Sequence, residues 1–246
     1  TVTITNTAAN DTDSTSLALD TVDATRLDVD AGTAGDLDIG AVTATNKLAT
    51  VDLSTQTTGQ VLAVDTIVDA DALTSITLTA AGGDLTIGAI GGSGNAEALS
   101  TITVSATNNA TATMGVTQMD DATNGTAADA TAADLAATVT GSATFGATTA
   151  LGSPTNTYGT VALNTSGAGT VSSTLVSAAD ITGTLAAGGT HAALTATDDI
   201  TLTTTNTNTL TLSALTIGTT VASSASITHT GTGRLNVSDL NASGGT

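Results

Sequence analysis

The chain contains no cysteine and no tryptophan, and its only aromatic residues are Phe145 and Tyr158. Without cysteine, disulfide bonds and thiol chemistry are excluded. Because 40% of the residues are hydrophobic but almost none is aromatic, a core must be built from small aliphatic side chains. An immunoglobulin-like sandwich usually places Trp or Tyr between its sheets, so this composition disfavours that fold.

Basic residues are almost as rare, since the chain has only Arg26, Lys47 and Arg234. With 22 acidic residues, the net charge is −19. Phosphate backbones are bound through Lys and Arg, so nucleic acid is excluded as a partner. No apolar run approaches the roughly 18 residues that a membrane span needs, and we expect no membrane insertion. The acidity favours cation binding, although it would also serve to keep a repetitive β-protein soluble.

The residues that dominate instead are Thr, Ala, Val and Gly, with Pro154 as the single proline. β-Branched Thr and Val favour strands, and the 26 glycines supply turns. The chain also repeats itself: residues 35–42 read GDLDIGAV and residues 83–90 read GDLTIGAI, with a weaker copy midway at Val61. ALTSITL at 72–78 returns as ALSTITV at 98–104.

This spacing of about 25 residues, with short strands joined by polar turns, predicts an all-β parallel β-solenoid. Tandem β-sandwich domains are the alternative fold, but their natural repeat is nearer 100 residues. In a solenoid, equivalent strands of successive coils pair about 4.8 Å apart. We therefore predict inward ladders of Leu37 over Val61 over Leu85 and of Val29 over Leu53 over Leu78. The anchor positions are then expected to continue through Ala112, Leu135, Val161, Leu185, Leu210 and Leu235, in steps of 23 to 27 residues.

The whole of 1–246 is predicted to be one solenoid body. Because it begins at Thr1 without Met, we expect it to be part of a longer chain. Two segments break the rhythm: residues 119–134 are Ala- and Asp-rich and predict an inserted loop or short helix, and residues 151–159 predict an exposed loop.

Aspartates are concentrated at the start of the chain, where three D-x-D pairs occur, and Asp28 is predicted to lie one coil from Asp52. Residues i and i+2 of a strand share a face, so each pair presents two carboxylates together. Such carboxylates repel each other unless a cation lies between them, and Ca²⁺ prefers oxygen ligands in flexible geometry. The predicted calcium ligands are Asp11, Asp13, Asp28, Asp30, Asp36, Asp38 and Asp52.

Signals for catalysis are poor, so we expect no enzyme. His191 and His229 are the only histidines and lack zinc-site spacing, and no G-x-S-x-G elbow occurs. A polysaccharide lyase is the enzyme alternative, since such enzymes use β-helices, but the chain has few basic or aromatic residues for a sugar groove.

Stretches such as ALTSITLTAAGGDLTIGAI and DITLTTTNTNTLTLSAL resemble the β-helical body of bacterial surface-layer proteins and of large secreted adhesins of the RTX group. The segment GGSGNAEAL at 91–99 is similar to one RTX nonapeptide, with Ala96 at the position of the calcium-binding Asp. The resemblance implies an extracellular protein on the bacterial cell surface that needs Ca²⁺ to fold or assemble.

From these observations the leading hypothesis is a structural protein that self-assembles with copies of itself into a layer or filament. Cell-surface polysaccharide would be a further partner, bound through another segment. The alternative is the stalk or passenger of a secreted adhesin, which predicts a monomer.

Overall fold

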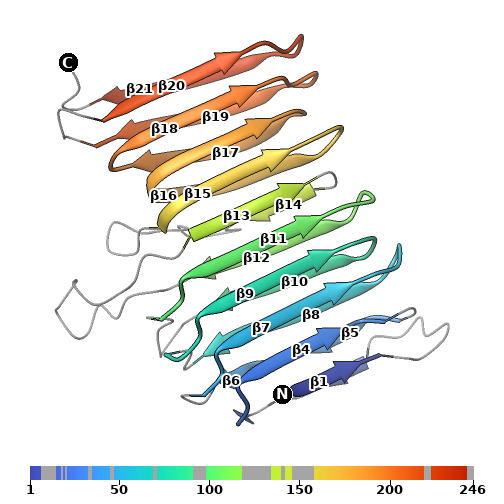
Figure 1. Ribbon diagram of the computed structural model, residues 1–246. Helices are drawn as coiled ribbons and strands as arrows, with labels where there is room; N and C mark the ends of the chain where they lie inside the picture. Colours follow the sequence, from blue (N-terminus) through green and yellow to red (C-terminus); the bar gives the residue numbers. More distant parts are fainter. Residues whose placement is uncertain are drawn as a thin grey trace.

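The strands of this protein lie in two layers that run along the length of the molecule, with the N-terminus at one end and the C-terminus at the other (Figure 1). Among the residues described there are strands and turns but no helix. This computed structural model describes residues 1–6, 15–17, 19, 21–32, 35–44, 47–68, 71–90, 98–117, 134–139, 142–145, 158–218 and 223–242.

The first layer is a ladder of parallel strands in which each strand comes from the next coil of the chain. In ladder order it contains β1 (Val2–Thr5), β4 (Arg26–Asp30), β7 (Thr50–Thr55), β9 (Ser75–Ala80), β11 (Thr101–Ala106), β13 (Asp134–Val139), β15 (Tyr158–Thr165), the second half of β16 (Thr170–Leu185), β18 (Asp199–Thr204) and β20 (Ser224–His229).

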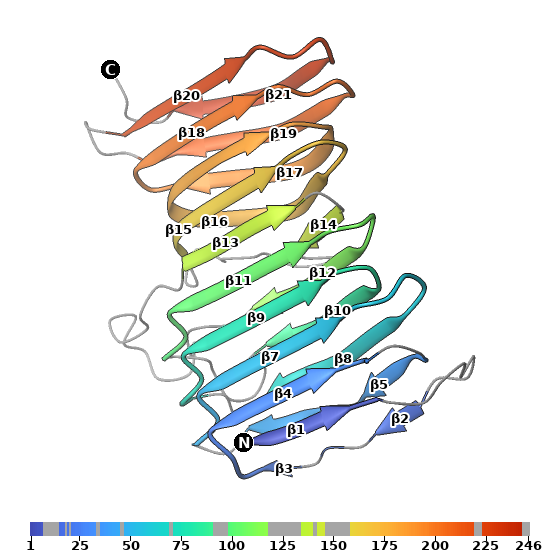
Figure 2. The ribbon, with the colours of Figure 1, turned by 45° about the vertical axis from the view of Figure 1, so that its right-hand side comes forward.

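The second layer is built in the same way and lies behind the first (Figure 2). It contains β2 (Thr15–Leu17), β5 (Leu37–Ile39), β8 (Val61–Val68), β10 (Asp84–Ile90), β12 (Thr111–Thr117), β14 (Ser142–Phe145), the first half of β16, β17 (Gly189–Ala196), β19 (Leu210–Ile217) and β21 (Leu235–Ala242), with β3 (Thr21–Val22) and β6 (Val42–Ala44) extending it beside β8.

The register of these ladders confirms the predicted β-solenoid. Val2 pairs with Leu27, and Leu53 pairs with Leu78, each a step of 25 residues. All the pairings are parallel, whereas the sheets of tandem sandwiches are antiparallel. The steps vary more than the predicted 23 to 27 residues, because the pairing of Ile102 with Leu135 spans 33 and that of Ser173 with His191 spans 18.

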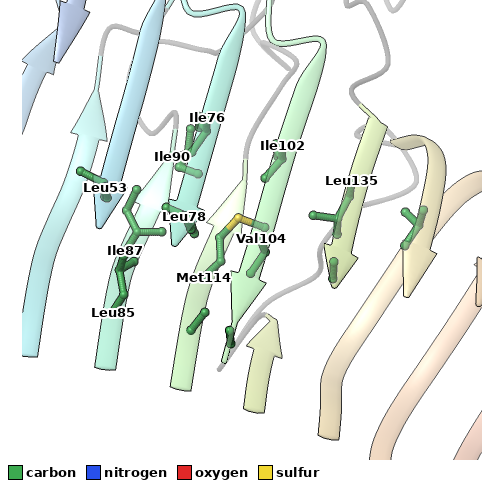
Figure 3. Close-up of a cluster of buried hydrophobic side chains, with 14 of the residues drawn as sticks. Leu53, Ile76, Leu78, Leu85, Ile87, Ile90, Ile102, Val104, Met114 and Leu135 are labelled. Atoms are coloured by element: carbon green, nitrogen blue, oxygen red, sulfur yellow. The ribbon is translucent and has the colours of Figure 1, made fainter. Parts of the chain in front are cut away.

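A single apolar core fills the space between the two layers. Alternate residues of each strand point inward, as in β9, whose side chains alternate between half-buried and buried. The predicted ladder of Val29, Leu53 and Leu78 is confirmed by register, and all three side chains are buried. Figure 3 shows the continuation of this core through Leu78, Val104 and their neighbours. Small aliphatic residues thus replace aromatic packing.

The other predicted ladder is wrong by one residue. Leu37 and Leu85 both pair with Leu62, not with Val61, whose outward side chain is 39% exposed. The later anchors also change layer, since Leu135 and Val161 pair with each other in the first layer. Val61 and Leu62 are both apolar, so a spacing of 24 residues cannot show which of them points inward. Since a shift of one residue along a strand moves a side chain to the opposite face of the sheet, the prediction placed the outward residue in the core.

The predicted insertions fall mostly outside the described residues. Of 119–134, only Asp134 is described, as the first residue of β13. Of 151–159, only Tyr158 and Gly159 are described, at the start of β15. The RTX-like segment is described only from residue 98 onward.

Candidate calcium-binding carboxylates

Two of the predicted calcium ligands meet on the outer surface of the first layer. Asp28 of β4 pairs directly with Asp52 of β7, as the repeat predicts. Their side chains are 38% and 25% exposed, so the carboxylates lie at the water boundary. Each strand is parallel to the next, and the two like charges are therefore held in neighbouring positions of one ladder.

A cation already lies between these carboxylates, and it belongs to the chain. The Arg26 guanidinium places Nε 3.0 Å from Asp52 Oδ2 and Nη2 3.5 Å from Asp28 Oδ2. Arg26 lies two residues before Asp28 on the same strand, so its side chain emerges on the same face. The repulsion that suggested a calcium ion is relieved here by a guanidinium group.

Asp30, the next residue on this face, stabilises the corner that follows β4. Its Oδ1 accepts the backbone N–H of Gly32 at 2.8 Å, and its Oδ2 accepts Nε2 of Gln56 at 2.5 Å. Gly32 has φ of 75°, a left-handed conformation that favours glycine. This carboxylate thus fixes a tight turn and joins two successive coils.

Asp36 caps a strand of the neighbouring coil. Its Oδ1 accepts the backbone N–H of Val61 at 2.8 Å, and Asp84 accepts that of Thr111 at 2.7 Å in the same way. Asp199 accepts both N–H and Oγ–H of Ser224, each at 2.8 Å. The first N–H group of a strand in a parallel ladder can point towards the preceding coil. If the paired strand of that coil does not start earlier, no backbone carbonyl lies opposite this N–H. The Asp carboxylate then supplies the hydrogen-bond acceptor.

These contacts explain the repeated octapeptide. In both copies the Asp directly precedes an apolar alternation, as Asp36 before Leu37 and Asp84 before Leu85. Sequence reasoning missed this role, although the pattern of Asp before alternating apolar residues is the signal that could have revealed it, and DITL at 199–202 repeats it.

The remaining predicted ligands do not form a described site. Asp38 lies on β5 with a half-buried side chain, while Asp11 and Asp13 lie outside the described residues. Across the described ranges, no three His, Asp or Glu side chains come together closely enough to hold a metal ion. Asp28, Asp30, Asp36 and Asp52 each have a partner within the chain, and their role as calcium ligands stays a prediction.

We expect Asp84→Ala to lower the free energy of unfolding by about 1 kcal/mol, because the Thr111 N–H loses its acceptor. Denaturant unfolding followed by circular dichroism measures the change. Asp65→Ala is the matched control, since Asp65 is an exposed residue of β8 in the neighbouring coil. An equal loss in the two variants would contradict the capping role.

Replacing Arg26 with Gln should lower stability by less than about 1 kcal/mol, since the ion pairs are substantially exposed. The same change removes the cation between Asp28 and Asp52, so millimolar Ca²⁺ should raise the melting temperature of the variant more than that of the wild type. Thermal unfolding with Ca²⁺ and with chelator tests this. Equal responses would mean that these two carboxylates need no cation.

Ser173 and His191 form a Ser–His pair in the core. Their Oγ and Nδ1 atoms are 2.8 Å apart, and the two residues are adjacent in the ladder between β16 and β17. His191 is fully buried and its Nε2 has no hydrogen-bond partner, while burial lowers the pKa of His191 to about 4. A substrate has no access to this pair, so it is a core contact.

A surface hollow of about 290 Å³ lies at the corner between the layers, lined by Gln60, Asp84 and Asn108 among others. Two of its polar side chains are engaged within the protein: Asp84 accepts the Thr111 N–H, and Asn108 Nδ2 donates to the Ala81 carbonyl at 2.8 Å.

Comparison with known proteins finds no matching family model, no similar curated protein and no matching solved structure. Within the part of the chain that the structure describes, no helix is long and apolar enough to cross a membrane.

Proposed function

We propose that this chain is the β-solenoid body of a structural protein that assembles with copies of itself into a layer or filament on the bacterial cell surface. The observation that carries the proposal is the unbroken ladder of parallel strands over one apolar core, from β1 to β20 in the first layer. Such a body is held by hydrogen bonds along its whole length, which suits a mechanical role.

The outer surface also supports a structural role. Outward positions of the first layer carry mostly Thr, Ser and Asp, as in Thr77 and Thr79 of β9 and Thr101 and Thr103 of β11. The resemblance of the sequence to surface-layer proteins points to the same class. Catalysis is no part of the proposal.

Calcium belongs to the proposal as the ion that permits assembly. Copies with a net charge of −19 repel one another, and a divalent cation between carboxylates of neighbouring copies would relieve that repulsion. Asp65, Asp71 and Asp198 are exposed, and carboxylates of this kind would supply the ligands between copies. Asp11, Asp13 and Asp38 remain candidate ligands as well.

The second candidate function is the stalk or passenger of a secreted adhesin. The rod-like stack of coils in Figure 1, with its ends far apart, would hold a binding domain away from the cell. This function needs no contact between copies and predicts a monomer in solution.

Light scattering and electron microscopy of the purified protein, in millimolar Ca²⁺ and in chelator, distinguish the two. The structural proposal expects ordered sheets or filaments that appear with Ca²⁺ and dissolve in chelator. A monodisperse rod in both conditions would favour the adhesin stalk and overturn calcium-dependent self-assembly.

A further inference from the structure

The core contains more polar groups in one part of the solenoid than in another. In the described coils from β4 to β12, the buried side chains are apolar apart from Thr55 and Gln60, and both of these have hydrogen-bond partners. Residues 158–218 hold six buried polar side chains, which are Thr165, Ser173, Ser177, His191, Thr204 and Asn206. Two of them, His191 and Asn206, each have a buried polar atom without a partner. The polar groups of this second part are therefore less well satisfied.

His191 is the titratable member of this buried group. It lies in the ladder between Ser173 of β16 and Leu212 of β19, and its Nδ1 is 2.8 Å from Ser173 Oγ. The other ring nitrogen, Nε2, is buried and has no partner. Protonation gives the ring two N–H donors and a full positive charge. Within the described residues, Ser173 Oγ is the one acceptor that this imidazolium would have.

No described carboxylate lies beside His191 to stabilise that charge. The other titratable side chains of 158–218 and of the neighbouring coil of β20 and β21 are Tyr158, Asp180, Asp198, Asp199, His229, Arg234 and Asp239. Tyr158 begins β15. Asp180 and Asp199 directly precede buried isoleucines, so their side chains face outward, where each accepts an N–H of the next coil. The remaining four are exposed. A charged His191 would therefore be buried without an ion pair, which is costly.

We propose that the coils of β16 to β19 form an acid-sensitive segment, in which protonation of His191 opens the solenoid locally while the coils of β4 to β11 stay folded. A solenoid permits local opening because each coil contacts only its neighbours. Acid favours the open segment, since water hydrates the imidazolium that the closed core leaves unpaired. The inference concerns the fold itself, and it holds for a layer protein and for a stalk alike.

Hydrogen–deuterium exchange with mass spectrometry, at pH 7 and at pH 4, tests this on the 246-residue protein after division by the intrinsic exchange rates. Peptides from 171–217 report the acid-sensitive segment, and peptides from 75–90 report β9 and β10. Burial lowers the pKa of His191 from 6.5 to about 4, so the opening constant of the segment should rise about a hundredfold between the two pH values. Protection of 75–90 should fall far less.

The comparison of these two regions in the wild type needs no variant. An equal fall of protection in both would mean that the solenoid opens as a whole, and unchanged protection of 171–217 at pH 4 would mean that the segment is not acid-sensitive. Either result overturns the proposal.

Variants then identify the group that is responsible. S173A/H191L should lose the hundredfold change in 171–217, because it has no buried imidazole. His229→Leu is the matched control, since it removes the exposed histidine of β20 and should keep the change in full. A fall in 171–217 that persists in S173A/H191L would show that His191 does not cause the opening.

Discussion

Replacing Gly115 with Ala should lower the free energy of unfolding by at least about 3 kcal/mol. A Cβ atom at Gly115 would overlap the carbonyl oxygen of Gly88 in the preceding coil. That oxygen belongs to the backbone of β10, so the clash is relieved only if a strand moves out of the ladder. Since β10 also pairs with β8, the displacement would spread along the stack.

Gly40→Ala is the matched control, because a Cβ there meets nothing within 4 Å. Gly40 occupies the equivalent position after β5 in an earlier coil, and its change should be close to neutral. Urea unfolding of both variants, followed by circular dichroism, measures the difference. Equal stability of the two variants would show that β10 and β12 are not stacked in the register described here.

The second large effect concerns the buried pair of Ser173 and His191. Burial lowers the pKa of His191 from 6.5 to about 4 in the folded protein. Between these two values the unfolded chain binds a proton that the folded chain does not, so folding stability falls as pH falls from 6.5 towards 4. The full loss from this one group is about 3 kcal/mol.

The double variant S173A/H191L should remove this loss. Both polar partners are replaced together, so neither is left unpaired in the core, and the variant should be at least as stable as the wild type at pH 7. The stability difference between variant and wild type should then grow by about 3 kcal/mol between pH 7 and pH 4, whatever the carboxylates contribute in common.

Ser173→Ala alone keeps His191 and should retain the pH dependence of the wild type. Chemical unfolding at a series of pH values supplies the data. A constant difference between the double variant and the wild type from pH 7 to pH 4 would show that His191 is not buried in the folded protein.

Much of the fold could be predicted from the sequence because a solenoid repeats its chemistry. The 25-residue spacing and the alternation in strands such as SITLTA are local, and they led to the correct ladder of Val29, Leu53 and Leu78. The pairing of Asp28 with Asp52 followed from the same period. The error at Val61 arose because two adjacent apolar residues fit the period equally well, and only the register of β8 against β5 shows that Leu62 is the inward one.

The roles of the aspartates could be predicted less well. The prediction that Asp28 and Asp52 lie on one face was correct. The repeat spacing does not show, however, that the Arg26 side chain reaches both carboxylates. The capping by Asp36 depends on where a strand begins one coil later, a property of two distant segments together. The calcium hypothesis therefore remains a prediction, with Asp11 and Asp13 outside the described residues.

Cryo-electron microscopy of the purified protein in Ca²⁺ buffer tests the proposed structural function most directly. We expect ordered layers or filaments built of many copies, in which each copy shows parallel strands spaced about 4.8 Å apart. Single molecules at every concentration would contradict it.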